Sequence, residues 1–283
     1  MLSMGQTNLK KYKLTVMEFT DEYDHNVPGV MYFPKSLPCK EVQDLYNYTL
    51  DGCKCETECT KHSACSCIGK SGTFYNYDNI YDTTSYMIHE NTIDSPTYEC
   101  NENCSCNKRV CGNRLVQFGP RKNLKIQFCG NGKGSGLFTA DEIKKGNFVC
   151  EYAGEIITEN QAFARFSSNS EQNKMNYIFC IKEHFGEKEV KTFIDPSHYG
   201  NLGRYINHSC EPNCKLYVVR INDAMPVLGI FANEDIKENS EITYNYGEGD
   251  LGIDNCGKYV KKKCLCNSQG CRKYLPFDVS LST

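Results

Sequence analysis

The residue types best suited to chemistry lie in one stretch, Arg204–Asn213, which reads Arg-Tyr-Ile-Asn-His-Ser-Cys-Glu-Pro-Asn. Its composition predicts the end of a strand that runs into an irregular loop, because Asn, His, Cys and a turn-forming Pro lie close together. An isolated Asn-His pair in such a run is usually a polar surface turn. Two downstream features favour a functional site instead. One is a Tyr-rich strand at Ile242–Gly247, and the other is a C-terminal Cys-x-Cys-x4-Cys group that lacks a fourth zinc ligand, which Cys210 could supply.

Cysteine is unusually abundant, with 19 residues in a chain of 283. A disulfide scaffold is the ordinary explanation for many cysteines, but it is typical of short secreted chains. Cys-x-Cys pairs suit a metal ion better than mutual disulfides, whose Cα separation and dihedral angle are demanding. Such pairs occur at positions 53/55, 65/67, 104/106 and 264/266. The spacing therefore predicts zinc.

Nine cysteines lie in two groups between residues 53 and 111. They cannot fill three separate tetrahedral sites, which need four ligands each. If three sulfurs bridge, each ion receives two bridging and two terminal thiolates, so the arithmetic favours a three-zinc cluster. An all-cysteine site leaves no open position for a substrate, so its role is structural. The nine ligands are Cys53, Cys55, Cys59, Cys65, Cys67, Cys100, Cys104, Cys106 and Cys111.

The net charge and the hydropathy of the chain restrict the kinds of molecule that we expect it to bind. The formal net charge is −3, and an acidic protein is a poor binder of bare DNA, because phosphate neutralisation requires clusters of Lys and Arg. Basic peptides suit it better, and no sequence-specific DNA binding is expected. No apolar run approaches membrane-spanning length, and residues 1–30 lack a signal pattern. We therefore expect a protein that is not secreted and has no membrane contact.

The Arg204–Asn213 stretch followed by the Tyr-rich strand resembles the signature of the SET-domain protein lysine methyltransferases. The cysteines at 53–111 resemble the pre-SET motif of the suppressor-of-variegation class of histone methyltransferases. The resemblance covers roughly residues 20–283. It is closest to the methyltransferase half of the SET–mariner transposase fusion protein, through Phe148–Glu155, Gly200–Arg204 and Leu275–Asp278. The DNA-cutting functions of a transposase are not implied.

The resemblance implies S-adenosylmethionine as the cofactor. In this family a Lys-Gly-x-Gly hairpin lets backbone groups reach it, and here the hairpin reads Lys133-Gly134-Ser135-Gly136. Asn207 and His208 would be the next contacts, because an Asn side chain and backbone groups can together meet an adenine ring. Arg204 either balances the cofactor's carboxylate or pairs with an acidic neighbour. His198 stands where many relatives have a cofactor-contacting Tyr.

The resemblance also implies an aromatic channel for the substrate lysine. Tyr152 would line it, and Tyr177 would lie near both cofactor and substrate. Methyl transfer requires a neutral lysine, whose free pKa is about 10.4. A dry aromatic channel and the sulfonium charge both disfavour a second cation. Tyr246 is the predicted central catalytic residue. Tyr244 occupies the family's product-specificity position, where Tyr rather than Phe implies mono- to dimethylation.

By position, the resemblance makes Cys53, Cys59 and Cys100 the bridging ligands of the three-zinc cluster. It also assigns a fourth zinc to a post-SET site. That site would pin the C-terminal tail against the Asn207 loop and so complete the substrate channel. Its ligands would be Cys210, Cys264, Cys266 and Cys271.

The segments between these motifs alternate short β-type runs with turns, so we expect a mostly β protein: a SET-domain β-fold of short strands and small sheets with few helices, plus a loop-rich three-zinc pre-SET region and a zinc-stapled post-SET tail. The capping box Thr158–Gln161 predicts a helix through about Phe166. A helical turn is expected at Ala140–Lys145, and Ile68–Glu99 is interpreted as a loop that packs on the zinc cluster. Strands are expected at 148–152, 177–181, 190–194, 216–221 and 227–231.

The chain is expected to divide into an N-terminal wrap (1–50), the pre-SET zinc cluster (51–115), the SET catalytic domain (116–248) and the post-SET zinc tail (249–283). The leading hypothesis is an enzyme of the nucleus and chromosome that methylates a lysine of the histone H3 tail, free or in the nucleosome. Two alternatives stay open: a methyltransferase of a non-histone protein, and a catalytically silent zinc module that binds basic tails.

Overall fold

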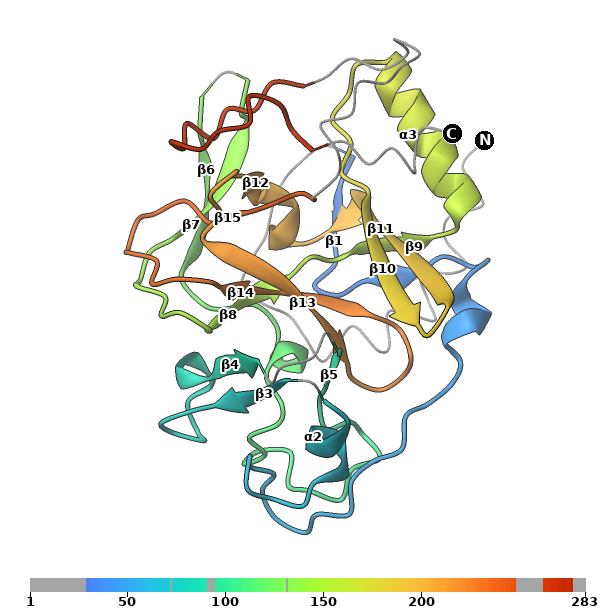
Figure 1. Cartoon of the computed structure of the whole chain (residues 1–283), viewed down its shortest axis with the longest axis vertical. Coiled ribbons are helices and arrows are strands. Elements are labelled where there is room, and N and C mark those ends of the chain that lie inside the picture. Colours follow the sequence, from blue (N-terminus) through green and yellow to red (C-terminus); the bar gives the residue numbers. More distant parts are fainter. Residues whose placement is uncertain (1–28, 72, 91–94, 131, 248–261, 277–283) are drawn as a thin grey trace.

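The computed structural model describes residues 29–71, 73–90, 95–130, 132–247 and 262–276. Most of the expected N-terminal wrap and much of the expected post-SET tail lie outside this range. Within it the protein is mostly β, with two α-helices, α2 (Ser66–Lys70) and α3 (Glu159–Glu171). The cysteine-rich segment that carries α2 lies at one end of the molecule, α3 lies at the other, and the main sheets lie between them (Figure 1). No described helix is long and apolar enough to cross a membrane.

One five-stranded sheet leads into the Arg204 stretch. Its order is β1-β11-β9-β2, and β10 pairs with β11. The predicted strand pair at 177–181 and 190–194 is confirmed as the antiparallel β10–β11 hairpin, but the first strand begins two residues later than predicted, at Phe179, and both strands continue past their predicted C-terminal ends. The strands are β1 (Met31–Tyr32), β2 (Leu37–Pro38), β9 (Gly154–Ile157), β10 (Phe179–Phe185) and β11 (Lys188–Gly200).

A six-stranded sheet carries the two motifs of the predicted site. Its order is β12-β15-β13-β14-β8, and β5 pairs with β13. The predicted strands at 148–152, 216–221 and 227–231 are confirmed as β8, β13 and β14. The strands are β5 (Thr97–Tyr98), β8 (Phe148–Glu151), β12 (Asn207–His208), β13 (Cys214–Arg220), β14 (Val227–Ala232) and β15 (Thr243–Tyr244).

Two further hairpins flank these sheets, β6 (Leu124–Phe128) with β7 (Ser135–Thr139), and β3 (Thr73–Asn76) with β4 (Met87–Glu90). The second hairpin shows that the loop prediction for 68–99 was wrong. Tyr75 is buried, its ring stacks on Phe231 with a centroid separation of 6.4 Å, and its hydroxyl donates to Glu99. This segment therefore packs mainly on the sheets, because its tyrosines bury more apolar area there than a surface loop would.

Of the two helical segments predicted near the site, the structure contains one. The capping box at Thr158 and Gln161 is present, and the helix it opens continues to Glu171. The predicted helical turn at 140–145 was wrong: Ile143 is fully buried and exchanges backbone hydrogen bonds with Ile236, each 2.8 Å long. Backbone N–H and C=O groups that pair with a distant segment of the chain cannot also form the hydrogen bonds of a helical turn.

The Arg204 stretch begins in a 3₁₀ helix and not at the end of a strand. This helix is one of four in the described residues, at Gln43–Tyr46, Thr83–Ser85, Val116–Phe118 and Leu202–Tyr205. The main core between the two large sheets contains fully buried Leu137, Ile194, Ile230 and Ile242, and it also includes the predicted site residues Tyr152 and Tyr244.

Candidate active site

Two segments that are distant in the sequence meet through the parallel pairing of β12 and β15, which sets Asn207 opposite Thr243 and His208 opposite Tyr244. The backbone N–H of Tyr246 donates to His208 Nδ1 at 3.2 Å. The Tyr246 hydroxyl donates to the Ile206 carbonyl at 3.0 Å. Tyr246 is therefore held on the Asn207 segment by its main chain and its side chain together.

Aromatic rings from strand β15 and from the segments that follow β8 and β15 gather beside this pairing. The Tyr244 ring lies 4.9 Å from that of Tyr246 and 5.9 Å from that of Tyr152. Tyr152 donates its hydroxyl hydrogen to the Tyr177 carbonyl at 2.6 Å. The structure thus brings the four predicted channel tyrosines together.

Burial controls the protonation of these phenols. Desolvation raises the pKa of Tyr152, Tyr244 and Tyr246 above the usual value for tyrosine. The effect has this sign because a low-dielectric site disfavours the charged phenolate. The three hydroxyls therefore stay protonated at neutral pH, so they can orient a substrate by hydrogen bonds but are poorly suited to act as bases.

The glycine hairpin lies against Asn207. The turn closes through the Cys129 N–H, which donates to the Gly134 carbonyl at 2.7 Å, and Gly134 has a φ of +76°. Asn207 Nδ2 donates to the Ser135 carbonyl at 3.2 Å. A Cβ at position 136 would lie 2.6 Å from Cys129 Sγ and 3.0 Å from Asn207 Nδ2. Glycine at position 136 is thus required for the hairpin and the Asn207 strand to approach each other.

Arg204 and His198, two of the predicted cofactor residues, lie away from the contacts between the glycine hairpin and Asn207. The Arg204 guanidinium lies over the rings of Tyr177 and Tyr205, 4.9 and 5.0 Å from their centroids, and forms an ion pair with no described carboxylate. Both alternatives for Arg204, the cofactor's carboxylate and an acidic neighbour, stay predictions. His198 is exposed on β11, and no described contact joins it to the hairpin or to Asn207.

Two residues of the site were missed by the sequence analysis. Phe179 packs its ring 5.9 Å from that of Tyr152 and 6.3 Å from that of Tyr244. Its position two residues after Tyr177 was an available signal, because alternate strand residues share a face. Glu241 contacts both Lys133 and Asn207, and no motif marked it.

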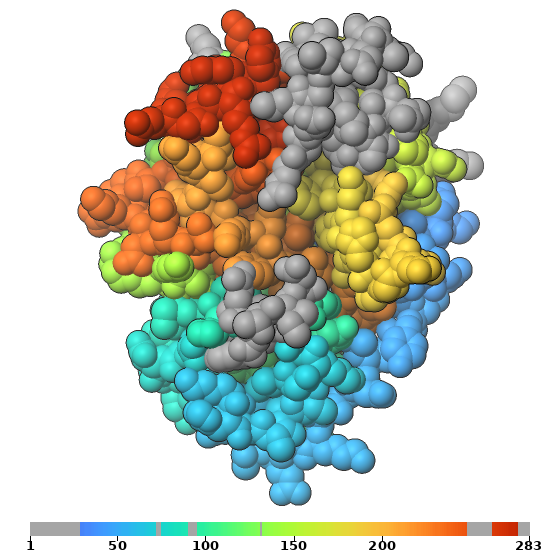
Figure 2. Space-filling view, in the orientation of Figure 1, coloured from blue at the N-terminus to red at the C-terminus, as the bar shows by residue number. Residues whose placement is uncertain are grey.

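The predicted post-SET ligands converge. The sulfur atoms of Cys210, Cys264, Cys266 and Cys271 all lie within 4.8 Å of one another, and those of Cys210 and Cys264 are 3.8 Å apart. Zinc–sulfur bonds of about 2.3 Å put two sulfurs of a tetrahedral site about 3.8 Å apart, so the donor set fits zinc. Figure 2 shows segment 262–276, in red, seated on the orange segment that includes Cys210.

Eight of the nine pre-SET thiols form three overlapping groups of four, and none of the described cysteines is in a disulfide. Three cysteines belong to more than one group, namely Cys53, Cys59 and Cys100, which are the predicted bridges. Within the first group the Cys67 and Cys104 sulfurs are 3.6 Å apart, and the ninth thiol, Cys111, lies 3.7 Å from the Cys106 sulfur; both separations suit zinc. The groups are Cys53/Cys67/Cys100/Cys104, Cys53/Cys59/Cys100/Cys106 and Cys53/Cys55/Cys59/Cys65.

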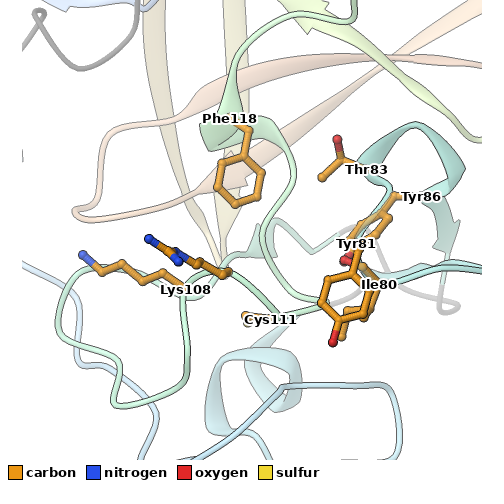
Figure 3. Close-up of a pocket in the computed structure, with 8 residues that line it drawn as sticks. Ile80, Tyr81, Thr83, Tyr86, Lys108, Cys111 and Phe118 are labelled. Atoms are coloured by element: carbon orange, nitrogen blue, oxygen red, sulfur yellow. The ribbon is translucent and has the colours of Figure 1, made fainter.

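A cavity of about 350 Å³ borders the pre-SET thiols at Cys111, and its lining is shown in Figure 3. Aromatic side chains, including Tyr81 and Phe118, line one part of it, and Lys108 and Arg109 line another. Cys111 also lines the cavity. In a metal-loaded cluster the thiolates outnumber the positive charges of the ions, so the two cations offset negative charge there. None of the predicted catalytic or cofactor residues reaches this cavity.

Comparison with known proteins agrees with this geometry. The SET domain family matches residues 134–247, and the Pre-SET motif matches residues 6–114. The probable histone-lysine N-methyltransferase set-23 of Caenorhabditis briggsae is 42% identical over 240 residues, which are 84% of this chain and 92% of that protein. The crystal structure of the methyltransferase domain of human SETMAR superposes with a TM-score of 0.71 at 31% identity, covering 92% of this chain and 93% of that one. KRYPTONITE, in complex with mCHH DNA, an H3(1-15) peptide and SAH, gives a TM-score of 0.67 at 27% identity, covering 90% of this chain and 49% of that one.

The fold, the converging tyrosines and the thiol clusters define a SET-domain methyltransferase. The chain belongs to the SET-domain family of histone-lysine N-methyltransferases, with the Pre-SET motif preceding the SET domain. The predicted likeness to the methyltransferase half of the fusion protein is confirmed by the SETMAR match.

Proposed function

We propose that this enzyme uses S-adenosylmethionine to mono- and dimethylate a lysine of the histone H3 tail on chromatin in the nucleus. The observation that carries the proposal is the group of hydrogen-bonded tyrosines fixed directly beside the Asn207–His208 strand. Relatives supply the cofactor class and the substrate class: KRYPTONITE was solved with SAH and an H3(1-15) peptide. The net charge of −3 also suits a basic tail.

The hairpin and the β12 strand would hold the cofactor. When bound, S-adenosylmethionine supplies a methyl group attached to a positively charged sulfur. Both N–H groups of the Asn207 amide are used within the protein, so its Oδ1 remains as an acceptor. Backbone groups of 134–136 and of His208 add further contacts. Arg204, which has no described acidic partner, is assigned to the cofactor's carboxylate.

The tyrosines would orient the lysine amine. The Tyr246 hydrogen is committed to the Ile206 carbonyl, so its oxygen offers only lone pairs to a neighbouring donor. A neutral amine has N–H groups to give to such an acceptor, and its own lone pair is then free to attack. The surrounding rings keep water out and disfavour a charged lysine. Positioning of this kind contributes up to roughly 7–11 kcal/mol in favourable cases.

Methylation of recombinant nucleosomes with radiolabelled cofactor, followed by mapping of the modified lysine, tests the substrate. We expect label on the histone H3 tail. Label confined to added non-histone proteins would reassign the substrate. No transfer to any protein by a metal-loaded, cofactor-binding preparation would instead indicate a silent module.

Product specificity should depend on the Tyr244 hydroxyl. The Tyr244 side chain is buried and packs against the Tyr152 ring, so Tyr244→Phe removes a hydroxyl that occupies channel space. We expect the main product to shift from mono- and dimethyl-lysine toward trimethyl-lysine, read by mass spectrometry of a reacted peptide. Tyr199→Phe, which removes a hydroxyl from a ring packed against Phe33, is the matched control. Mostly trimethyl-lysine from the unmodified enzyme would contradict this assignment.

A further inference from the structure

The carboxylate of Glu241 lies between the glycine hairpin and the strand that carries Asn207. Its Oε2 is 2.5 Å from Lys133 Nζ, and its Oε1 accepts a hydrogen bond from Asn207 Nδ2 at 2.9 Å. The Cys129 thiol donates to the same Oε1 at 3.6 Å. One carboxylate therefore joins both sides of the hairpin turn to the strand that carries Asn207.

The main chain fixes Glu241 in this place. It forms an isolated bridge with Phe138 of β7, and the next residue, Ile242, is fully buried and donates its N–H to the Leu137 carbonyl at 2.7 Å. The Glu241 carbonyl accepts from Asn213 Nδ2 at 2.8 Å. The side chain is 21% exposed, so its contacts are only partly screened by solvent. Both the position and the direction of the carboxylate are thus set by the sheet.

Glu241 also decides which way the Asn207 amide faces. Asn207 Nδ2 contacts Glu241 Oε1 and the Ser135 carbonyl. A carboxylate and a carbonyl can only accept, so the amide must present its NH2 group to both. Its Oδ1 consequently faces away and has no hydrogen-bond partner among the described residues. An acceptor held in one orientation suits an N–H or O–H donor on a ligand.

We propose that Glu241 is a positioning residue for the cofactor, which holds the glycine hairpin and the Asn207 amide in the arrangement that binds it. This inference rests on the proposed function. Glu241 acts through Lys133 and Asn207 and does not contact the Tyr246 hydroxyl in the structure. Its loss should therefore weaken cofactor binding far more than it slows methyl transfer at saturating cofactor.

Glu241→Gln tests this with little change in side-chain size. Glutamine has one acceptor oxygen, so it can accept from Lys133 or from Asn207 but not from both. We expect the dissociation constant of SAH, measured by calorimetry, to rise about 10- to 100-fold, which corresponds to the loss of one charge-assisted hydrogen bond. The turnover number at saturating cofactor should change less than about 3-fold.

Glu238→Gln is the matched control, because it makes the same charge change on an exposed side chain with no described partner. It should leave the dissociation constant unchanged. Lys133→Met combined with Glu241→Gln should weaken binding by less than the product of the single effects, because both remove the same ion pair. An unchanged dissociation constant in Glu241→Gln, with or without a lower melting temperature, would overturn the inference while leaving the proposed function intact. Absence of SAH binding by the unmodified protein would refute both.

Discussion

Replacing Tyr246 by phenylalanine should lower the turnover number at least about 100-fold, the scale expected when a reacting group is misplaced. The hydroxyl is fixed by its bond to the Ile206 carbonyl, and the ring is fixed by packing on Tyr244 and His208. Phenylalanine keeps the packing but removes the oxygen that would hold the lysine amine. The cofactor dissociation constant should change little, because the hairpin and Asn207 are untouched.

The measurement pairs single-turnover kinetics on an H3 peptide with calorimetric binding of SAH. Tyr199→Phe again controls for loss of a tyrosine hydroxyl outside the aromatic group. A modest loss of stability is expected in Tyr246→Phe, of about 1 kcal/mol, because a net hydrogen bond is lost. A parallel fall in affinity and turnover would show that Tyr246 holds the site together and does not take part in the transfer step.

The features predicted correctly from the sequence share a local or compositional signal. Thr158 and Gln161 form a capping box within four residues, and β13 and β14 are runs of β-favouring residues separated by a turn. The cysteine groups were predicted equally well, because closely spaced cysteines in a chain of this kind have few roles other than binding metal ions. Family resemblance then assigned roles to residues such as Tyr246, which composition alone marks only as a strand aromatic.

The features that escaped prediction depend on contacts between distant segments. Ile143 lies in a sequence that suits a helical turn, yet its backbone pairs with Ile236. Glu241 resembles any exposed acidic residue until the fold places it between Lys133 and Asn207. Tertiary contacts of this kind override local propensity, so the residues that position a site are harder to find than those that form its motifs.

The proposed substrate channel would be built from the sheets and from the C-terminal segment, which have unequal structural support. The Asn207 strand and the tyrosines belong to sheets with a buried core, whereas segment 262–276 forms only an isolated bridge, between Lys263 and Tyr274, and no named strand. His208 Nε2 lies 3.4 Å from Cys210 Sγ. The post-SET thiolates therefore connect the least supported segment directly to the proposed cofactor strand.

Removing metal from the post-SET site should abolish methyl transfer before the sheets unfold. Three of its four ligands are only partly buried, whereas eight of the nine pre-SET thiols are buried, so a chelator reaches the post-SET ion first. Without the ion, little but a few hydrogen bonds, such as Arg272 N–H to Cys210 Sγ at 3.3 Å, holds the tail. Because metal binding supplies much of the folding free energy of such small sites, the tail should detach and open the channel.

Graded chelation, followed by metal analysis, activity and circular dichroism, measures this sequence of events. We expect loss of about one zinc in four, and of roughly 90% or more of the activity, with the β-sheet signal unchanged. Cys264→Ser should reproduce this state, whereas Cys180→Ser, on a partly buried thiol outside both clusters, should retain full metal and activity. If activity persists after the first zinc is lost, the C-terminal segment is not needed for methyl transfer and the prediction is wrong. Simultaneous loss of the sheet signal would show that the post-SET site stabilises the whole fold and not the channel alone.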